Sequence, residues 1–316
     1  MKKLLLLLLV VPGIAFSQSW PTKPVRIVLP FGPGGVADIT TRTLAPRLSD
    51  GFGQQVVVEN MPGAGGIRAA ETVARADPDG HTLLLLTNGN AVSQALFKSL
   101  PYDPVNDFAT ISTVSYFSMV IVTGANSKYK TLQDVIAEAK KNPGRLNIGT
   151  ISPGGTQHLA GELFRSTAGI DALVVPHKTT GEVVIGVRNG SLDVGVDFIA
   201  PLVSGIRAGD LRALAMTAGK RFKGLPDVPT AIEAGVRGYD VASWNALAAP
   251  AKTPRAVIDR VHKELVKALA APDVQSRFAD LGVEPRASTP AELRELFISE
   301  SRRWSRVVEA AKIPKQ

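Results

Sequence analysis

The sequence predicts an α/β protein of two domains that are joined by two chain segments. Strand-like and helix-like stretches alternate from Val25 to Met216, as in parallel sheets that are covered by helices. A strand, a Pro-Gly-Gly turn and a helix follow one another twice, with Pro33 and Pro153 at matching places. The 316 residues are also enough for two domains of ordinary size.

The first residues have the form of a secretory signal peptide. Lys2 and Lys3 precede an apolar run from Leu4 to Phe16, which is shorter than the ~20 residues of a membrane span. A proline and a glycine interrupt this run, which argues against a permanent anchor. We therefore expect residues 1–17 to be a signal peptide, cleaved after Ser17, and the mature chain to be periplasmic.

Composition excludes several classes of protein. The chain has no cysteine, which rules out disulfides, thiolate metal sites, a cysteine nucleophile and a lipid-bearing N-terminal cysteine. The net charge of +8 falls to +6 when Lys2 and Lys3 leave with the signal peptide. Because the basic residues are scattered and no basic cluster is interleaved with aromatic residues, we expect no binding to nucleic acid. The positive charge instead favours anionic small molecules.

The first half of the mature chain predicts a parallel sheet. Its strands are nearly continuous apolar runs, as expected for strands that are buried on both faces. A loop is expected from Asn88 onward, and then one long strand that crosses into a second domain near Thr123. The expected strands are 27–29, 55–58, 81–86 and 108–122, and the expected helices are 36–48 and 67–76.

The second half repeats the alternation and then becomes helical. Thr131 caps a helix that ends at Asn142, and the alternation continues to Met216. A stretch from Tyr239 to Pro250 predicts a second crossing strand. Two C-terminal helices should then pack back on the first domain, since the second already closes its own sheet. The predicted domains are 18–124 with 240–316, and 125–239, and two crossings of this kind form a hinge that lets a bilobed protein close around a ligand.

Each Pro-Gly-Gly turn is a predicted anion site. It lies between the end of a strand and the start of a helix, where backbone N–H groups are free and the helix dipole favours negative charge. When the two turns are superposed, Pro33-Gly34-Gly35 matches 153–155, and Asp38 falls where His158 falls. Two such turns indicate paired lobes that face one ligand.

Motifs of catalysis are missing from the sequence. There is no Gly-x-Ser-x-Gly, no His-x-x-x-His pair and no metal-ligand constellation. Gly32 and Gly34 resemble the start of a dinucleotide fingerprint, but position 37 is Ala, and an exported protein has little access to NAD. We therefore predict no catalytic residues, no metal and no cofactor.

Several short motifs follow one another along the mature chain. They are Pro21-x-x-Pro24, Pro30-Phe31-x-Pro33-Gly34-Gly35-x-x-Asp38, Glu59-Asn60-x-Pro62-Gly63-Ala64-Gly65-Gly66, Asp79-Gly80-x-Thr82, Leu100-Pro101-Tyr102-Asp103, Asp107-Phe108 and Ala249-Pro250. Together they resemble the Bug-type receptors of tripartite tricarboxylate transporters, from about Trp20 to the C-terminus. The resemblance implies a bilobed periplasmic-binding-protein fold, similar to type II, and a receptor that hands an organic acid to membrane transporter subunits.

The resemblance also implies which residues line the ligand cleft. They belong to the two glycine turns, the loop after the third strand, the turn after Val175 and the strand end near 197. Two of these places depart from the family pattern: 176–179 reads Pro-His-Lys-Thr and 88–90 reads Asn-Gly-Asn, so the identity of the ligand cannot be carried over. The predicted ligand-binding residues are Phe31, Gly32, Pro33, Gly34, Gly35, Asp38, Asn88, Asn90, Ala91, Ser152, Gly154, Gly155, Thr156, His158, Lys178, Thr179 and Asp197.

Several of these residues have a competing structural interpretation. Asp38 either touches the ligand or braces its loop, and for an anionic ligand bracing is favoured. His158 is expected to donate to a carboxylate, whereas Lys178 either pairs with the ligand or is solvated. Asp197 lies at a strand end, where α/β sheets place ligands, but it could equally cap a loop. Trp244 is expected to pack in the core or hinge.

The favoured hypothesis is a monomeric periplasmic receptor for a small carboxylate. The alternative is a sensory adaptor whose loaded form engages a membrane sensor kinase, and an exported enzyme is a third hypothesis. The sequence alone does not separate delivery to a transporter from signalling.

Overall fold

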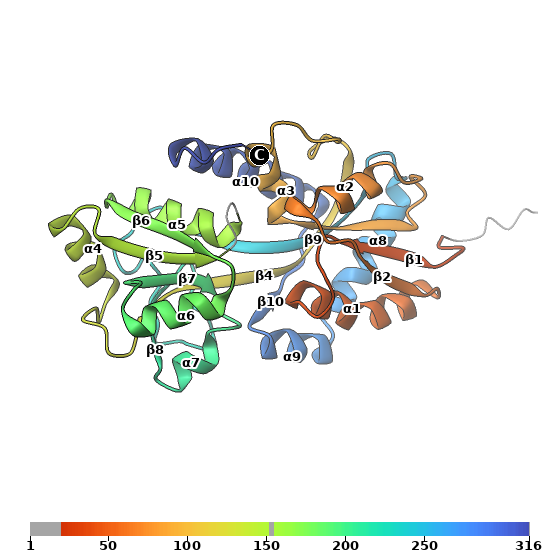
Figure 1. Cartoon of the computed structure of the whole chain (residues 1–316). Coiled ribbons are helices and arrows are strands. Elements are labelled where there is room, and N and C mark those ends of the chain that lie inside the picture. Colours follow the sequence, from red (N-terminus) through yellow and green to blue (C-terminus); the bar gives the residue numbers. More distant parts are fainter. Residues whose placement is uncertain (1–19, 152–154, 316) are drawn as a thin grey trace, which may run out of the picture.

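A computed structural model describes residues 20–151 and 155–315 of the chain. Its helices and strands form two lobes, and its two longest strands run between them (Figure 1). These crossing strands are β4 (Phe108–Gly124) and β9 (Ala242–Pro250). The α/β class and the two crossing segments predicted from the sequence are therefore confirmed, whereas the domain boundaries at 124 and 239 stay a prediction.

The first lobe is built on a mixed sheet of order β2-β1-β3-β9-β4-β10. Its first three strands are parallel, as predicted, and their apolar side chains pack against helices on both faces: α1 and α8 on one, α2 and α10 on the other. Its elements besides the crossing strands are β1 (Val25–Leu29), α1 (Val36–Phe52), β2 (Val56–Asn60), the 3-10 turn η1 (Ala64–Gly66), α2 (Ile67–Ala74), β3 (Thr82–Thr87), α3 (Asn88–Leu96), α8 (Arg255–Leu269), α9 (Pro272–Asp280), β10 (Val283–Pro285) and α10 (Pro290–Ala310).

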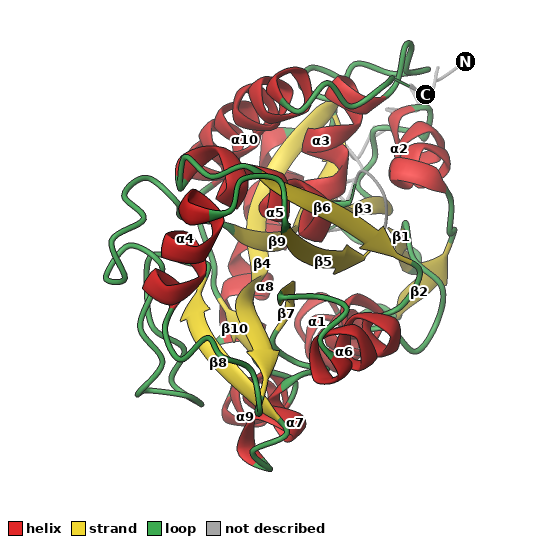
Figure 2. Ribbon diagram, turned by 60° about the vertical axis from the view of Figure 1, so that its left-hand side comes forward, coloured by secondary structure: helices red, strands yellow, loops and turns green. Residues whose placement is uncertain are grey.

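The second lobe extends from the other end of β4. Its sheet has the order β8-β4-β7-β5-β6, in which β5 is parallel to β6 and β7. Helices α4 and α5 cover one face, and α6 and α7 cover the other (Figure 2). The elements are α4 (Leu132–Lys141), β5 (Leu146–Ile151), α5 (Thr156–Thr167), β6 (Ala172–His177), α6 (Thr180–Asn189), β7 (Val194–Phe198), α7 (Val203–Arg207) and β8 (Leu211–Met216).

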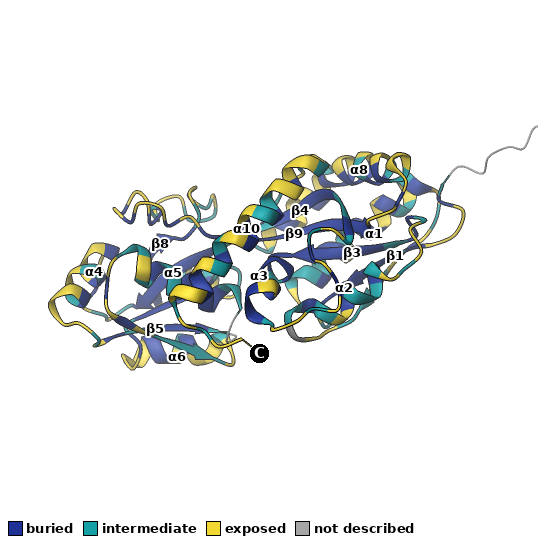
Figure 3. Cartoon of the chain, turned by 90° about the horizontal axis from the view of Figure 1, so that it is seen from above, coloured by how far each residue is buried: buried dark blue, intermediate teal, exposed yellow. Residues whose placement is uncertain are grey.

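Buried strands and half-exposed helices give each lobe its own core. The strands are buried along most of their length, while the helices expose only their outer faces (Figure 3). Fully buried side chains include Leu83 to Leu86 of β3, which explains why this strand reads as a continuous apolar run.

One threonine forms hydrogen bonds that connect β8, β4 and β9 where the chain crosses between the lobes. Thr217, just after β8, donates its N–H to the Met119 carbonyl of β4 over 3.0 Å, and its hydroxyl donates to the Val241 carbonyl over 2.7 Å. The N–H of Val241, just before β9, returns a bond to the Thr217 carbonyl. This residue is fully buried, so the crossing is a hydrogen-bonded junction.

Two sequence expectations about the fold were wrong. The loop expected from Asn88 is the helix α3, because Thr87 and Asn90 form a capping box that starts a helix where Asn-Gly-Asn resembles a turn. The C-terminal region is not only helical, because the short strand β10 pairs with β4.

The packing of the C-terminal helix also differs from expectation. Near its start, Leu293 and Phe297 of α10 join the core of the first lobe, as expected. Further along, Trp304 and Val308 join the cluster that contains Phe164 of α5 and the core of the second lobe. Helix α10 thus spans both lobes, as Figure 1 shows.

Candidate functional site

The first glycine turn is open to solvent and braced from behind. A Cβ added at Gly32, Gly34 or Gly35 would meet no heavy atom within 4 Å, and Gly34 has a φ of +84°. The buried carboxylate of Asp38 accepts the Gly34 N–H over 2.9 Å. This N–H, which the sequence left free for a ligand, is therefore already used. Pro33 and Phe31 are exposed, and the Phe31 carbonyl accepts from the amide of Asn60.

Asp38 has its hydrogen-bonding capacity filled within the protein. Asn60 donates to it over 2.9 Å, and so does the guanidinium of Arg42. Burial would raise the pKa of Asp38, but the Gly34 N–H, Asn60 and Arg42 together lower it below its ordinary value. The carboxylate is thus a fixed anion that braces the turn. The N–H groups from Gly35 to Asp38 remain outside the helix ladder, whose first bond runs from Ile39 to Gly35.

The predicted residues of α3 are buried and have different roles. Asn90 accepts from the N–H and the hydroxyl of Thr87, both over 2.9 Å, so its carbonyl caps the helix. Ala91 belongs to the hydrophobic core between β1, β3 and α2. Asn88 is fully buried, and its amide nitrogen donates to Thr156 of α5 over 3.2 Å. Asn88 therefore joins the first lobe to the second.

The second glycine turn is described only from Gly155, because Ser152 and Gly154 lie outside the described residues. Gly155 is the N-cap of α5, and no side chain of the described residues caps this helix start. His158 is nearly buried, with its Nε2 3.9 Å from Oε1 of Glu162. Burial lowers the pKa of His158 more than Glu162 raises it, so the imidazole is neutral at pH 7.

Asp197 connects the starts of two helices. Its fully buried carboxylate accepts from the Thr180 hydroxyl of α6 over 2.6 Å and from the Gln157 amide of α5 over 3.3 Å. Burial raises the pKa of Asp197, although Thr180, the Phe198 N–H and Gln157 oppose this. The sequence singled out Asp197 but missed Thr180 and Gln157, whose roles depend on contacts between distant segments.

The remaining predicted residues lie on the surface at the start of α6. Lys178 and Thr179 are exposed. The Thr179 hydroxyl accepts the Glu182 N–H over 3.3 Å, and the Lys178 N–H donates to the Glu182 carboxylate. A carboxylate of the protein thus already occupies this helix start.

The structure brings the starts of three helices together through two side chains. Asn88 links α3 to α5, and Asp197 links α5 to α6. Each of these helices follows the carboxyl end of a strand, which is the edge where α/β proteins bind ligands. Helix starts present N–H donors, so this arrangement suits an anion.

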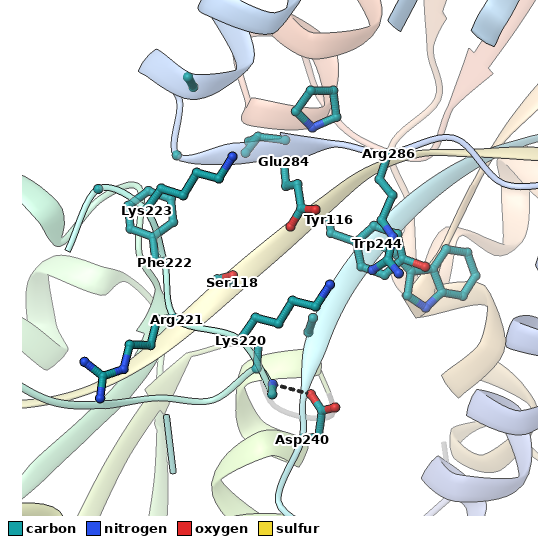
Figure 4. Close-up of a pocket in the computed structure, with 18 of the residues that line it drawn as sticks. Tyr116, Ser118, Lys220, Arg221, Phe222, Lys223, Asp240, Trp244, Glu284 and Arg286 are labelled. Atoms are coloured by element: carbon teal, nitrogen blue, oxygen red, sulfur yellow. Dashed lines mark hydrogen bonds between the residues drawn. The ribbon is translucent and has the colours of Figure 1, made fainter. Parts of the chain in front are cut away.

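A large groove lies elsewhere, against the crossing strands (Figure 4). It has a volume of about 1080 Å³ and is lined by Tyr116, Ser118, Ala242 and Trp244 of the two strands, by the segment 218–224, and by β10 and α10. Its lining includes none of the predicted site residues. Phe117, between Tyr116 and Ser118, instead faces away and contacts Phe198, next to Asp197, with ring centroids 6.0 Å apart. The groove and the Phe117 ring thus lie on opposite faces of β4.

Two further features are absent from the described residues. Across residues 20–151 and 155–315, no group of three or more His, Asp or Glu side chains is placed to hold a metal ion. Within the same ranges, no helix is both long and apolar enough to span a membrane.

Comparisons with known proteins identify the family of this chain. The family model of the tripartite tricarboxylate transporter family receptor matches residues 40–313. The protein BugT of Bordetella pertussis is 33% identical, over 92% of this chain and 90% of its own. A Rhodopseudomonas palustris protein solved with adipate is 30% identical with a TM-score of 0.78, covering 94% of this chain and 100% of its own. MatC of the same organism, solved with bound malate, is 31% identical with a TM-score of 0.75, covering 92% of this chain and 100% of its own.

The resemblance noted in the sequence is therefore confirmed in family and in fold. This chain belongs to the receptor family of tripartite tricarboxylate transporters, whose members are periplasmic solute-binding proteins rather than enzymes.

Proposed function

We propose that this protein captures a small organic acid, of the di- or tricarboxylate class, between its two lobes and delivers it to the membrane subunits of a tripartite transporter. The proposal has support from two similar receptors that were solved with the dicarboxylates adipate and malate. It also has support from the excess of positive charge, which attracts anions.

The observation that carries the proposal is the hydrogen bond between Asn88 and Thr156. It joins the start of α3 in one lobe to the start of α5 in the other, and among the described residues no side chain caps the first N–H groups of α5. Hydrogen bonds to a charged ligand contribute ~1.5–3 kcal/mol each. A carboxylate that accepts four or five of them would reach the ~8 kcal/mol of micromolar binding.

The structure favours donors rather than cations as ligand contacts. Asp38 and Asp197 are each occupied by donors of the protein, and the buried His158 is neutral. Lys178 is exposed beside a helix start that Glu182 caps. We therefore propose that backbone N–H groups of Gly35 and Gly155, with the side chain of Thr156 that Asn88 orients, contact the ligand carboxylate.

The first test is thermal unfolding of the mature protein, which is unfolded and refolded beforehand to remove any resident ligand. The panel contains malate, adipate, citrate, acidic amino acids and aromatic acids. A ligand at 100 times its Kd should add ~2.7 kcal/mol to the free energy of unfolding and raise Tm accordingly. A well-folded sample that responds to none of these acids would contradict the proposal, and turnover of a bound acid would favour the exported enzyme.

The partner, the oligomeric state and the processing of the chain are parts of the same proposal. We propose a monomer that starts after Ser17 and has its domains at 18–124 with 240–316, and at 125–239. Mass measurement of the exported protein tests the cleavage, and light scattering tests the monomer. Co-purification with transporter subunits in the presence of ligand would support delivery, whereas co-purification with a sensor kinase would favour the adaptor hypothesis.

A further inference from the structure

We propose that Trp304, on the C-terminal helix α10, is a positioning residue for the ligand. Its indole N–H holds the carbonyl oxygen of Asn88, so that the NH2 group of Asn88 faces Thr156 and the hydroxyl of Thr156 is left to donate into the cleft. This inference rests on the proposed function, because it explains how the cleft selects an acceptor such as a carboxylate.

The three side chains form a continuous chain of hydrogen bonds. Nε1 of Trp304 lies 3.1 Å from Oδ1 of Asn88, and Nδ2 of Asn88 lies 3.2 Å from Oγ1 of Thr156. Trp304 and Asn88 are fully buried, and Thr156 is partly exposed. The chain therefore starts inside the protein and ends where solvent and ligand can reach.

The chemistry of the indole fixes the direction of every bond. An indole N–H can only donate, so the atom of Asn88 that faces it must be the carbonyl oxygen. The orientation of the amide, which is often ambiguous, is thereby settled. Because the amide nitrogen donates to Thr156, the hydrogen of the Thr156 hydroxyl is left to donate onward, and the second hydrogen of the amide is also left. Hydrogen bonds that run in one direction also strengthen one another.

The position of the indole is itself fixed by neighbours on α10. Nε1 of Trp304 also lies 2.8 Å from Oε2 of Glu300, so one N–H is shared between two acceptors. Oε1 of Glu300 accepts from Arg303 over 3.2 Å, and the guanidinium of Arg303 lies 5.2 Å from the centre of the indole. The ring belongs to the same buried cluster as Val308 of α10 and Leu159 of α5. The ring is thus held where α3, α5 and α10 meet.

The competing interpretation is that Trp304 only fills the core. The variant Trp304→Phe separates the two, because it keeps an aromatic ring and removes the N–H donor. Trp244→Phe is the matched control: Trp244 is also a fully buried tryptophan beside α10, but its Nε1 has no hydrogen-bond partner among the described residues. Both variants delete one indole N–H, and only the first should free the amide of Asn88.

The test compares the Kd of malate and adipate with that of their monoamides. In Trp304→Phe the amide of Asn88 can turn its carbonyl toward Thr156 and accept the hydroxyl hydrogen that the ligand would otherwise receive, so we expect carboxylate affinity to fall about tenfold, while affinity for the monoamides falls less. Trp244→Phe should leave the ratio unchanged. Equal losses for acid and amide in Trp304→Phe, or no loss at all, would overturn the positioning role.

A measurement without ligand distinguishes failure of this inference from failure of the proposed function. The side-chain NH2 signal of Asn88, assigned by its loss in Asn88→Asp, should exchange slowly with solvent in the wild type and faster in Trp304→Phe. Unchanged exchange would overturn the inference even if the acids bind. Faster exchange in a protein that binds neither malate nor adipate would support the positioning of Asn88 and contradict the proposed ligand class.

Discussion

Buried polar side chains, rather than surface charges, determine the shape of the candidate cleft. Asp197 shows this most clearly, because its carboxylate is fully buried and its donors among the described residues are all neutral: the Thr180 hydroxyl, the Phe198 N–H and the Gln157 amide. Burial without a cation favours the protonated form and raises the pKa of Asp197. Its folded-state pKa therefore lies above the ordinary value of 3.8.

This raised pKa predicts a pH dependence of stability. Between the ordinary and the raised pKa, the folded state binds more protons at Asp197 than the unfolded state does, so stability rises as the pH falls through this window. Asn at this position cannot titrate. We therefore expect the free energy of unfolding of wild type to increase relative to Asp197→Asn as the pH is lowered from 7 to 4, measured by urea unfolding.

A second aspartate provides a control of opposite sign. The pKa of Asp134 is lowered, because its exposed carboxylate accepts the Lys130 and Thr131 N–H groups at the start of α4. Relative to Asp134→Asn, wild type should lose stability as the pH falls below about 4, the ordinary pKa of the residue. If the free energy of unfolding, measured relative to each variant, changed with pH in the same direction for both, Asp197 would not be the group that causes the predicted pH dependence.

At the scale of single elements, the glycine turn before α1 is the part of the site that can be tested most directly. Gly34→Val places a β-branched residue at φ +84°, which costs on the order of 1–3 kcal/mol of strain, although its Cβ would meet open space. Gly53 at the other end of α1 has φ +69° and equally open surroundings, so Gly53→Val is a matched control. We expect similar losses of stability in both, and loss of acid binding in Gly34→Val alone. Equal affinities in the two variants would remove this turn from the site.

The elements that the sequence predicted are those with local signals. Continuous apolar runs indicated β1 and β3, and Thr131 with Asp134 marked the start of α4. Helix α3 was missed because Asn90 replaces the usual Glu or Gln at the third position of its capping box. Strand β10 has three residues, too few for a period, and exists because β4 offers it an edge.

The candidate site was predictable in its loops but not in its contacts. The Pro-Gly-Gly turns and Asp38 follow from local chemistry, since a glycine turn at a helix start and a nearby carboxylate occur within a few residues. The contact between Asn88 and Trp304 joins residues 216 positions apart, and that between Gln157 and Asp197 joins residues 40 positions apart. No local pattern encodes such pairs, because the fold alone brings them together.

At the scale of the whole molecule, a groove with charged side chains lies against the two crossing strands, on the face of β4 opposite to Phe117. The groove is lined by Lys220 and Lys223 of the second lobe and by Glu284 and Arg286 of the first, which Figure 4 shows around β4. The groove thus spans both lobes. Because Phe117 and Tyr116 point to opposite faces of β4, a rotation that brings the lobes together on the Phe117 face should widen the groove.

Spin labels across the groove measure this rotation directly. The chain has no cysteine, so Lys223→Cys with Glu284→Cys can be labelled without background, and both residues are exposed. We expect the distance between the labels to lengthen when the acid found in the thermal panel is added. The control pair Lys141→Cys and Arg188→Cys lies within the second lobe and should keep its distance.

If both pairs stay constant while the acid binds, the lobes do not rotate, and the ligand must enter a cleft that is already closed. If both pairs change, the second lobe itself deforms and the crossing strands are not the hinge.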